Sequence, residues 1–265
     1  MSTYSTYGQH QHFATPKITW GVQHLILIST LIFAIQLVLD PVLIALAPTY
    51  TQPSITPSEL LAHWFGFQPS NFLYGQIWKP FTYIFLHGGL SHLFMNMLWL
   101  YFLGPDVERA LGTRQFYRFY IFCGALGVLM NYFTMWGSGA EPSVIGGSGA
   151  VLGVLVACAM LDLDREFFLF GVPFPINIRW LVGIAILLNV ITALGPGSGT
   201  SVATHFGGMA AGFLYMRMRP HWTRWERARK EKAMRKPKRT KKKKDKDPLG
   251  EQVDNILRFK DKDFE

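Results

Sequence analysis

The chain has 265 residues, of which 49% are hydrophobic and only 16% are charged. A soluble domain usually carries about a quarter of charged residues. Here the apolar residues instead gather in long runs, as in proteins that cross a membrane several times. The net charge of +9 comes mainly from one end, since 19 of the 26 Lys and Arg residues lie from Arg217 onward. The composition therefore argues against an ordinary soluble enzyme and predicts a polytopic membrane protein.

The first apolar run predicts the first membrane helix. Residues 1–19 are polar and lack the basic and apolar regions of a cleavable signal peptide. We therefore expect the run from Trp20 to Leu39 to act as an uncleaved insertion signal and to end as a helix at Asp40-Pro41. From Pro41 to about Leu90 the chain is rich in proline and aromatic residues. This segment predicts a structured element lying partly in the membrane interface.

Later apolar runs predict five further helices, at about Ser91–Leu103, Phe116–Trp136, Gly147 to before Asp162, Trp180–Leu194 and Val202–Arg217. Several fall short of the roughly 20 residues that cross a bilayer core. Short helices suggest local thinning of the membrane, or a helix end inside a water-filled cavity. The expected fold is an all-α membrane protein, a six-helix bundle over residues 20–217 with a long interfacial loop between its first two helices.

Basic residues near the helix ends predict the orientation. The link after the second helix holds Arg109, Arg114 and Arg118, and the link after the fourth helix holds Arg165 and Arg179. The links at 137–145 and 195–201 contain no Lys or Arg. Because cytoplasmic loops carry the excess of basic residues, both termini are expected to be cytoplasmic.

The tail, residues 218–265, is strongly basic. A solvated charge run that sets topology is the plainer explanation, and contact with anionic lipid is a second one. A basic run can also bind nucleic acid. Since this run follows a membrane helix, we expect no nucleic-acid partner.

Polar residues cluster at one end of three parallel helices. His92 and Asn96 lie in the first turns of the second helix, Ser148 starts the fourth, and His205 lies in the first turn of the sixth. Polar groups in hydrocarbon mark function by default. A serine needs a base to become a nucleophile, and the transition state needs donors for its oxyanion. His92 and Asn96 share one helix face, and free N–H groups begin the fourth helix. The alternative is packing or a polar clamp between helices.

Glycines surround these residues. Gly146, Gly147 and Gly149 place the serine on a backbone that can turn sharply, while small residues at spacing i, i+4 let membrane helices approach closely. If the fourth and sixth helices pack through such faces, Ser148 and His205 come within hydrogen-bond reach. The packing residues are Gly153, Gly208 and Gly212.

These motifs resemble those of the rhomboid family of intramembrane proteases. The matching elements are Gly146-x-Ser148-Gly149, His205-x-x-Gly208-x-x-x-Gly212, His92-x-x-x-Asn96 and Gly104-x-x-x-Glu108-x-x-x-Gly112. Each motif alone is weak, but the four occur in the right order on the right helices. The resemblance covers about Trp64 to Arg217.

The resemblance implies a serine endopeptidase with a Ser148–His205 dyad and no aspartate. Its substrates would be single-pass membrane proteins, unwound and cut near the outer face. Asn96, His92 and the Ser148 amide would bind the oxyanion, and neither a metal nor a cofactor is implied. We expect a multi-pass protein of a bacterial inner membrane. The alternatives are a catalytically weak or inactive relative that binds membrane clients, and a small transporter.

Two positions depart from the family pattern. Lys79 follows Trp78 where an arginine is usual, and a lysine lacks the planar fork of arginine. Leu152 stands where the family often has an aromatic that stacks on the histidine. His87 is expected either to structure its loop or to support the oxyanion. Glu108 is expected to be a structural cap or an ion-pair partner at the cytoplasmic face.

Overall fold

The computed structural model of the chain describes residues 17–46, 57–135, 143–168, 174–195, 202–219, 249–250 and 252–253. The chain divides into two compact units, Met1–Arg219 and Pro220–Glu265. Most of the predicted basic tail, and with it the expected contact with anionic lipid, lies outside the described residues. The same holds for the predicted polar N-terminus before residue 17.

The first helix, α1, extends from Trp20 to Leu46 and contains Pro41. Our prediction that this helix ends at Asp40-Pro41 was wrong. Proline removes one backbone hydrogen bond, the one that would run to the carbonyl of Leu37, and membrane helices tolerate that loss where other groups compensate. The apolar residues after the proline therefore continue the helix.

Short helices occupy the long segment that follows. They are α2 (Pro57–Phe65), α3 (Pro69–Leu73), α4 (Lys79–Thr82) and the 3-10 helix η2 (Tyr83–Phe85). Prolines stand in the first turns of α2, α3 and α4, where their missing N–H is not needed. The described part of this segment, residues 57–90, thus contains several short helices. Its predicted position in the membrane interface stays a prediction.

Three side chains around α4 satisfy the last carbonyl groups of α2. Lys79 Nζ donates to the His63 carbonyl at 2.5 Å, Trp78 Nε1 to that of Trp64 at 3.0 Å, and Thr82 Oγ1 to that of Phe65 at 2.7 Å. The last carbonyls of a helix have no partner within it. Lysine therefore steadies this loop through a single amine contact rather than through the fork of an arginine.

The remaining long helices are α5 (Leu90–Leu111), α6 (Thr113–Met135), α7 (Ser148–Leu161), α8 (Ile178–Leu194) and a last helix over 202–219. We predicted that the second membrane helix would end at about Leu103 or a few residues later, but α5 continues through Pro105 to Leu111. Between α7 and α8, the strands β1 (Glu166–Phe167) and β2 (Ile176–Asn177) pair antiparallel. This short ladder was not predicted.

Apolar side chains cover the outer faces of α1 and α8. More than half of the surface of Leu27 and Leu31 in α1, and of Leu187 and Ile191 in α8, is exposed. Soluble proteins rarely leave such faces in water, whereas lipid tails solvate them. Of the described helices, only α1 is both long and apolar enough by itself to cross a membrane, with a mean hydropathy of 2.1 over Trp20–Leu39. α7 and α8 are apolar but shorter.

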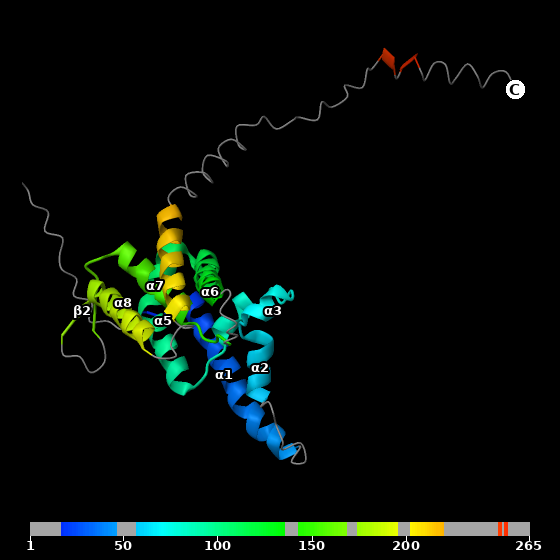
Figure 1. Cartoon of the computed structure of the whole chain (residues 1–265). Helices are drawn as coiled ribbons and strands as arrows, with labels where there is room; N and C mark the ends of the chain where they lie inside the picture. The colour runs from blue at the N-terminus through cyan, green and yellow to red at the C-terminus, as the bar shows by residue number, and fades with distance from the viewer. Residues whose placement is uncertain are drawn as a thin grey trace, which may run out of the picture. The chain divides into compact units, whose positions relative to one another are not determined.

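Glycines let the last helix pack closely between α7 and α6 (Figure 1). A methyl group on Gly208 would lie 2.0 Å from the carbonyl oxygen of Gly149 in α7, and one on Gly212 would lie 2.5 Å from that of Gly153. On the other side, a methyl group on Gly127 of α6 would lie 3.2 Å from the backbone nitrogen of Gly208. Only residues without a side chain allow backbones to approach this closely.

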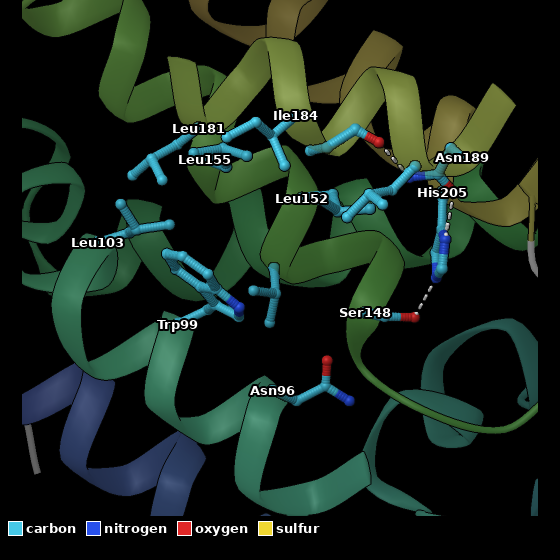
Figure 2. A pocket seen from close by; sticks show the side chains of 13 residues that line it. Asn96, Trp99, Leu103, Ser148, Leu152, Leu155, Leu181, Ile184, Asn189 and His205 are labelled. Carbon is cyan, nitrogen blue, oxygen red and sulfur yellow. Dashed lines mark hydrogen bonds between the residues drawn. The ribbon is translucent and has the colours of Figure 1, made fainter. Parts of the chain in front are cut away.

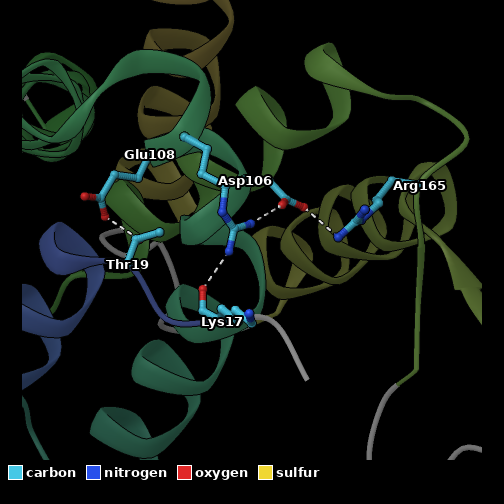
Figure 3. A network of polar contacts seen from close by, with 6 residues as sticks. Lys17, Thr19, Asp106, Glu108 and Arg165 are labelled. Atoms are coloured by element: carbon cyan, nitrogen blue, oxygen red, sulfur yellow. Dashed lines mark hydrogen bonds and ion pairs between the residues drawn. The ribbon is translucent and has the colours of Figure 1, made fainter. Parts of the chain in front are cut away.

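The buried carboxylate of Glu108 in α5 caps the N-terminus of α1 (Figure 3). It accepts hydrogen bonds from the N–H groups of Gly21 and Val22, both at 2.9 Å, from the Thr113 hydroxyl at 2.6 Å and from Thr19. The first N–H groups of a helix have no partner within it, and a carboxylate suits the positive end of the helix dipole. Of the two roles expected for Glu108, the structure shows the cap.

Asp106, two residues earlier, joins three segments at the same end of α5 (Figure 3). Its carboxylate pairs with Arg109 and with Arg165, each at 3.0 Å. Arg109 also donates to the carbonyl of Lys17 at 2.6 Å. This network ties the start of α1 and the end of α7 to α5.

Candidate active site

The long segment holds the backbone that leads into α7. Val144 and Phe67 exchange two backbone hydrogen bonds, at 2.8 and 2.9 Å, and the N–H of Gly146 donates to the Tyr83 carbonyl at 2.9 Å. Gly146 has a φ of +116°, and a methyl group there would lie 2.5 Å from Cε1 of His92. Both the backbone conformation and the histidine therefore require glycine at position 146.

Ser148 is the first residue of α7, and His205 lies near the start of the last helix. His205 Nε2 lies 2.7 Å from Ser148 Oγ (Figure 2), although the residues are 57 positions apart in the sequence. Both side chains are partly buried. A serine hydroxyl at this distance from an imidazole nitrogen has the geometry of a nucleophile with its general base.

A third polar residue contacts the imidazole from α8. Oδ1 of Asn189 lies 2.7 Å from Nδ1 of His205, and Nδ2 of Asn189 donates to the Ala185 carbonyl at 2.8 Å (Figure 2). Asn189 was not among the site residues that the sequence predicted. A signal was present, because Asn189 is the only amide or charged side chain between Trp180 and Leu194, and polar residues inside membrane helices mark functional positions.

A cavity of about 260 Å³ opens beside Ser148 and His205 (Figure 2). Its walls are mostly apolar and come from three helices, with Trp99 and Leu103 from α5, Leu152 and Leu155 from α7, and Leu181 and Ile184 from α8. Asn96 also lines the cavity, and its buried Nδ2 has no hydrogen-bond partner among the described residues. The same cavity wall thus holds Ser148 and an amide whose donor has no partner within the described part of the chain.

His92 does not line this cavity. Its ring lies against Gly146 and packs edge-on to the ring of His87, with centroids 5.2 Å apart. His87 is buried, and the amide of Gln36 in α1 binds both its backbone N–H, at 3.2 Å, and its carbonyl, at 3.3 Å. These contacts favour a role in loop structure for His87 over support of an oxyanion.

Free N–H groups at the start of α7 provide further donors. The first intrahelical bond runs from Val151 to the Gly147 carbonyl, so the N–H groups of Ser148 and the two residues after it have no partner within the helix. Gly147 is closely surrounded, since a methyl group there would lie 2.7 Å from the Tyr120 hydroxyl. Because α7 begins at Ser148, the positive end of its dipole lies at the serine.

Among the described residues, no group of three or more His, Cys, Asp or Glu side chains is placed to hold a metal ion. Cys123 and Cys158 are buried and unbridged, and burial of this kind suits small core side chains. The polar side chains that line the cavity carry a hydroxyl, an imidazole and two amides, and a hydroxyl with a base and hydrogen-bond donors can carry out acyl transfer.

The fold and the site together define a helical bundle with an apolar exterior that holds a serine–histidine pair at the wall of a cavity. The family model for the rhomboid domain matches residues 74–221, which is more than half of the chain. The chain therefore belongs to the rhomboid family, whose members are integral membrane proteins with several helical spans.

Relatives occur in a plant and in a bacterium. The chain is 31% identical over 148 residues to RHOMBOID-like protein 4 of Arabidopsis thaliana, covering 55% of this chain and 35% of the relative. It is 30% identical over 143 residues to the putative rhomboid protease YdcA of Bacillus subtilis, covering 53% and 66%. It is 31% identical over 164 residues to the rhomboid protease GluP of the same organism, covering 60% and 29%. The chain thus spans between 29% and 66% of the length of these relatives.

Proposed function

We propose that this protein is an intramembrane serine endopeptidase that cleaves single-pass membrane proteins near the outer face of the membrane. The observation that carries the proposal is the 2.7 Å contact between Ser148 Oγ and His205 Nε2 at the wall of an apolar cavity. Relatives whose names contain rhomboid protease support the same class of chemistry.

In the proposed reaction, His205 Nε2 accepts the hydroxyl proton as Ser148 Oγ attacks the carbonyl carbon of the scissile peptide bond. The oxyanion is stabilised by Nδ2 of Asn96 and by the backbone N–H of Ser148. His205 then gives the proton to the leaving amine as the C–N bond breaks. Water attacks the acyl-enzyme and passes a proton through His205 back to Ser148 Oγ, which releases the carboxylic acid.

Of the two predicted side-chain donors, we assign the direct oxyanion contact to Asn96, which lines the cavity. His92 lies behind Gly146, and we assign it the support of that backbone. Gly147 and Gly149 are proposed to serve the site by allowing close contact, because a methyl group on Gly149 would lie 3.1 Å from the side chain and the carbonyl of Thr204.

The apolar lining of the cavity supports a substrate that comes from the membrane. An extended peptide binds there through its apolar side chains, while its carbonyl oxygen reaches the donors beside Ser148. A peptide bond within a helix is shielded by its own hydrogen bonds and by side chains. The substrate helix must therefore unwind locally, which is easiest at small residues.

We propose that α1, α5, α6, α7, α8 and the last helix are six membrane spans of a domain over residues 20–217. The segment 57–85 would lie partly in the interface, as exposed aromatic residues such as Trp64 and Trp78 favour. Arginines gather where α5 meets α6 and between the end of α7 and the start of α8, which supports cytoplasmic termini. The tail at 218–265 would then lie beside anionic lipid. Relatives occur both in a plant and in a bacterium. The bacterial inner membrane stays a prediction.

The proposal is tested by labelling with a fluorophosphonate probe in membranes. Wild type is compared with Ser148→Ala, His205→Ala and the control Ser143→Ala, which alters an exposed serine five residues upstream. We expect wild type and the control to be labelled and the other two variants to remain unlabelled. Size-exclusion profiles and melting temperatures verify that each variant is folded.

In a separate reaction, protein that has not been exposed to the probe is incubated with a single-pass reporter in proteoliposomes, and the cleavage products are mapped by mass spectrometry. Absence of labelling and of cleavage in folded wild type, with probes of two sizes, would overturn the proposal. The alternative of a catalytically weak or inactive member that binds membrane clients would then lead.

A further inference from the structure

We propose that Asn189 is a positioning residue, which holds His205 in the tautomer and orientation that allow it to accept the proton of Ser148. The inference rests on the proposed protease function and deepens it. It adds to the serine–histidine pair a third side chain, supplied by a helix that carries neither reacting group.

The contact with Asn189 bears first on the tautomer of His205. A neutral imidazole has one nitrogen that donates and one that accepts. To accept the serine proton, Nε2 must be the acceptor, so the ring proton must lie on Nδ1. The 2.7 Å contact between Nδ1 and the amide oxygen of Asn189 favours this tautomer, because an amide oxygen can only accept.

The second step is the orientation of the Asn189 amide. Its Nδ2 donates to the carbonyl of Ala185 at 2.8 Å, and that carbonyl can only accept. If the amide were flipped, two oxygens would face each other there, and the NH₂ group would face the His205 nitrogen. The backbone of α8 therefore selects the amide orientation, and the amide in turn selects the tautomer of the imidazole.

The third step is the cost of this arrangement. Asn189 is 8% exposed in an otherwise apolar stretch of helix, and an amide in such surroundings is unfavourable unless its polar atoms are bonded. Thr192, three residues on, bonds the Leu188 carbonyl at 2.8 Å from an exposed position. A polar side chain of α8 can therefore bond to the preceding turn while remaining exposed, as Thr192 does. Asn189 differs from Thr192 in that it also contacts His205.

The other neighbours of His205 leave its orientation to hydrogen bonds. Leu152, which lines the same cavity, has no ring that could stack on the imidazole. Within the described part of the chain, the imidazole of His205 makes polar contacts with Ser148 and Asn189, one at each ring nitrogen. Fixing the ring between two hydrogen bonds achieves what an aromatic neighbour would otherwise do by stacking.

The test compares three variants in proteoliposomes containing a single-pass reporter. Asn189→Leu removes the acceptor at similar size, Asn189→Asp keeps an acceptor oxygen at the same place, and Thr192→Val is the matched control on the same helix. We expect kcat for Asn189→Leu to fall on the order of tenfold, the effect of one ordinary hydrogen bond, with KM unchanged. Asn189→Asp should retain more activity than Asn189→Leu, and Thr192→Val should equal wild type.

The melting temperature separates positioning from structure, because leucine suits an apolar helix and should leave it unchanged or raise it. Wild-type kcat in Asn189→Leu, or equal losses in both Asn189 variants with a raised KM, would overturn the role of Asn189. A wild type that is inactive from the outset would overturn the protease function itself.

A second measurement needs no turnover. Nitrogen-15 spectra of histidine-labelled protein, assigned by comparison with His205→Ala, report which ring nitrogen carries the proton. We expect the proton on Nδ1 in wild type and a mixture of tautomers in Asn189→Leu. A proton on Nε2 in wild type would contradict the proposal even if every variant remained active.

Discussion

Gly208 of the last helix lies directly against the peptide carbonyl of Gly149 in α7, so that a methyl group on Gly208 would approach that oxygen to 2.0 Å. Gly149 follows Ser148, and His205 lies three residues before Gly208. The backbone contact between the two glycines therefore sets how closely the serine hydroxyl and the imidazole can meet. The proposed chemistry depends on helix packing as directly as on the reacting residues.

Replacing Gly208 by alanine should push the last helix away from α7. Overpacking of this kind typically costs about 1–3 kcal/mol, and here it also lengthens the contact between Ser148 and His205. We expect a lower melting temperature and a strong loss of fluorophosphonate labelling. The control is Gly183→Ala in α8, where nothing lies within 4 Å of the added methyl group. That variant should be as stable as wild type or more so, and equal behaviour of both variants would contradict this account.

Gly146→Ala should be more harmful than Gly75→Ala. Both glycines have positive φ angles, of +116° and +91°, so alanine is strained at each, typically by about 1–3 kcal/mol. Only at position 146 would the methyl group also collide, at 2.5 Å, with the His92 ring, while nothing lies within 4 Å at position 75. Melting temperatures and labelling rates of the two variants separate backbone strain from this collision. Similar losses would show that the contact with His92 is unimportant.

Glu108→Ala should destabilise the bundle far more than Asp106→Ala. Removing the Glu108 carboxylate leaves the N–H groups of Gly21 and Val22 buried without an acceptor, at about 1–3 kcal/mol for each unsatisfied group. The Asp106 pairs are more exposed, and such pairs contribute roughly 0–1 kcal/mol. Melting temperatures in detergent show which of the two variants is less stable. A Glu108→Ala variant as stable as Asp106→Ala would contradict the capping role.

The buried amine of Lys79 should make the stability of the protein depend on pH. Burial lowers the pKa of its amine below the ordinary value of 10.5. At a pH below the lowered pKa the amine is charged in both the folded and unfolded states, and the full cost of burying the charge is present. As the pH rises from there toward 10.5, the unfolded state binds more protons than the folded state, so the folded state gains stability.

The matched comparison is with Lys79→Met, which has a side chain of similar length and no charge. The melting temperature of wild type should rise relative to that of Lys79→Met between neutral pH and about pH 10.5. A constant difference across this range would mean that the amine keeps its ordinary pKa despite its burial.

Much of the architecture could be predicted from the chain alone. The long apolar runs located all of the long helices, and α7 begins and ends within a residue of its expected limits. The ends at Pro41 and Leu103 were misplaced because local rules treat proline as a stop. In a packed bundle, neighbouring helices compensate for the single bond that proline removes.

Part of the site could also be predicted from the sequence. Ser148 and His205 stood out because polar side chains are rare within apolar helices, and the glycines around them indicated close packing. Asn189 obeys the same rule and was missed, because one amide in an apolar run has no partner within its own segment. Its partner, His205, is supplied by another helix.

The sequence by itself determined that this is a membrane protein, roughly where its long helices lie and which polar residues stand within its apolar segments. These properties follow from composition and from spacing along one segment, so they need no knowledge of other segments. Only the tertiary structure decided which polar atoms meet: Ser148 with His205, His205 with Asn189, Lys79 with the end of α2, and Glu108 with the start of α1. Such contacts depend on side-chain directions and on how closely separate helices pack, and a shift of about an ångström is enough to make or break a hydrogen bond.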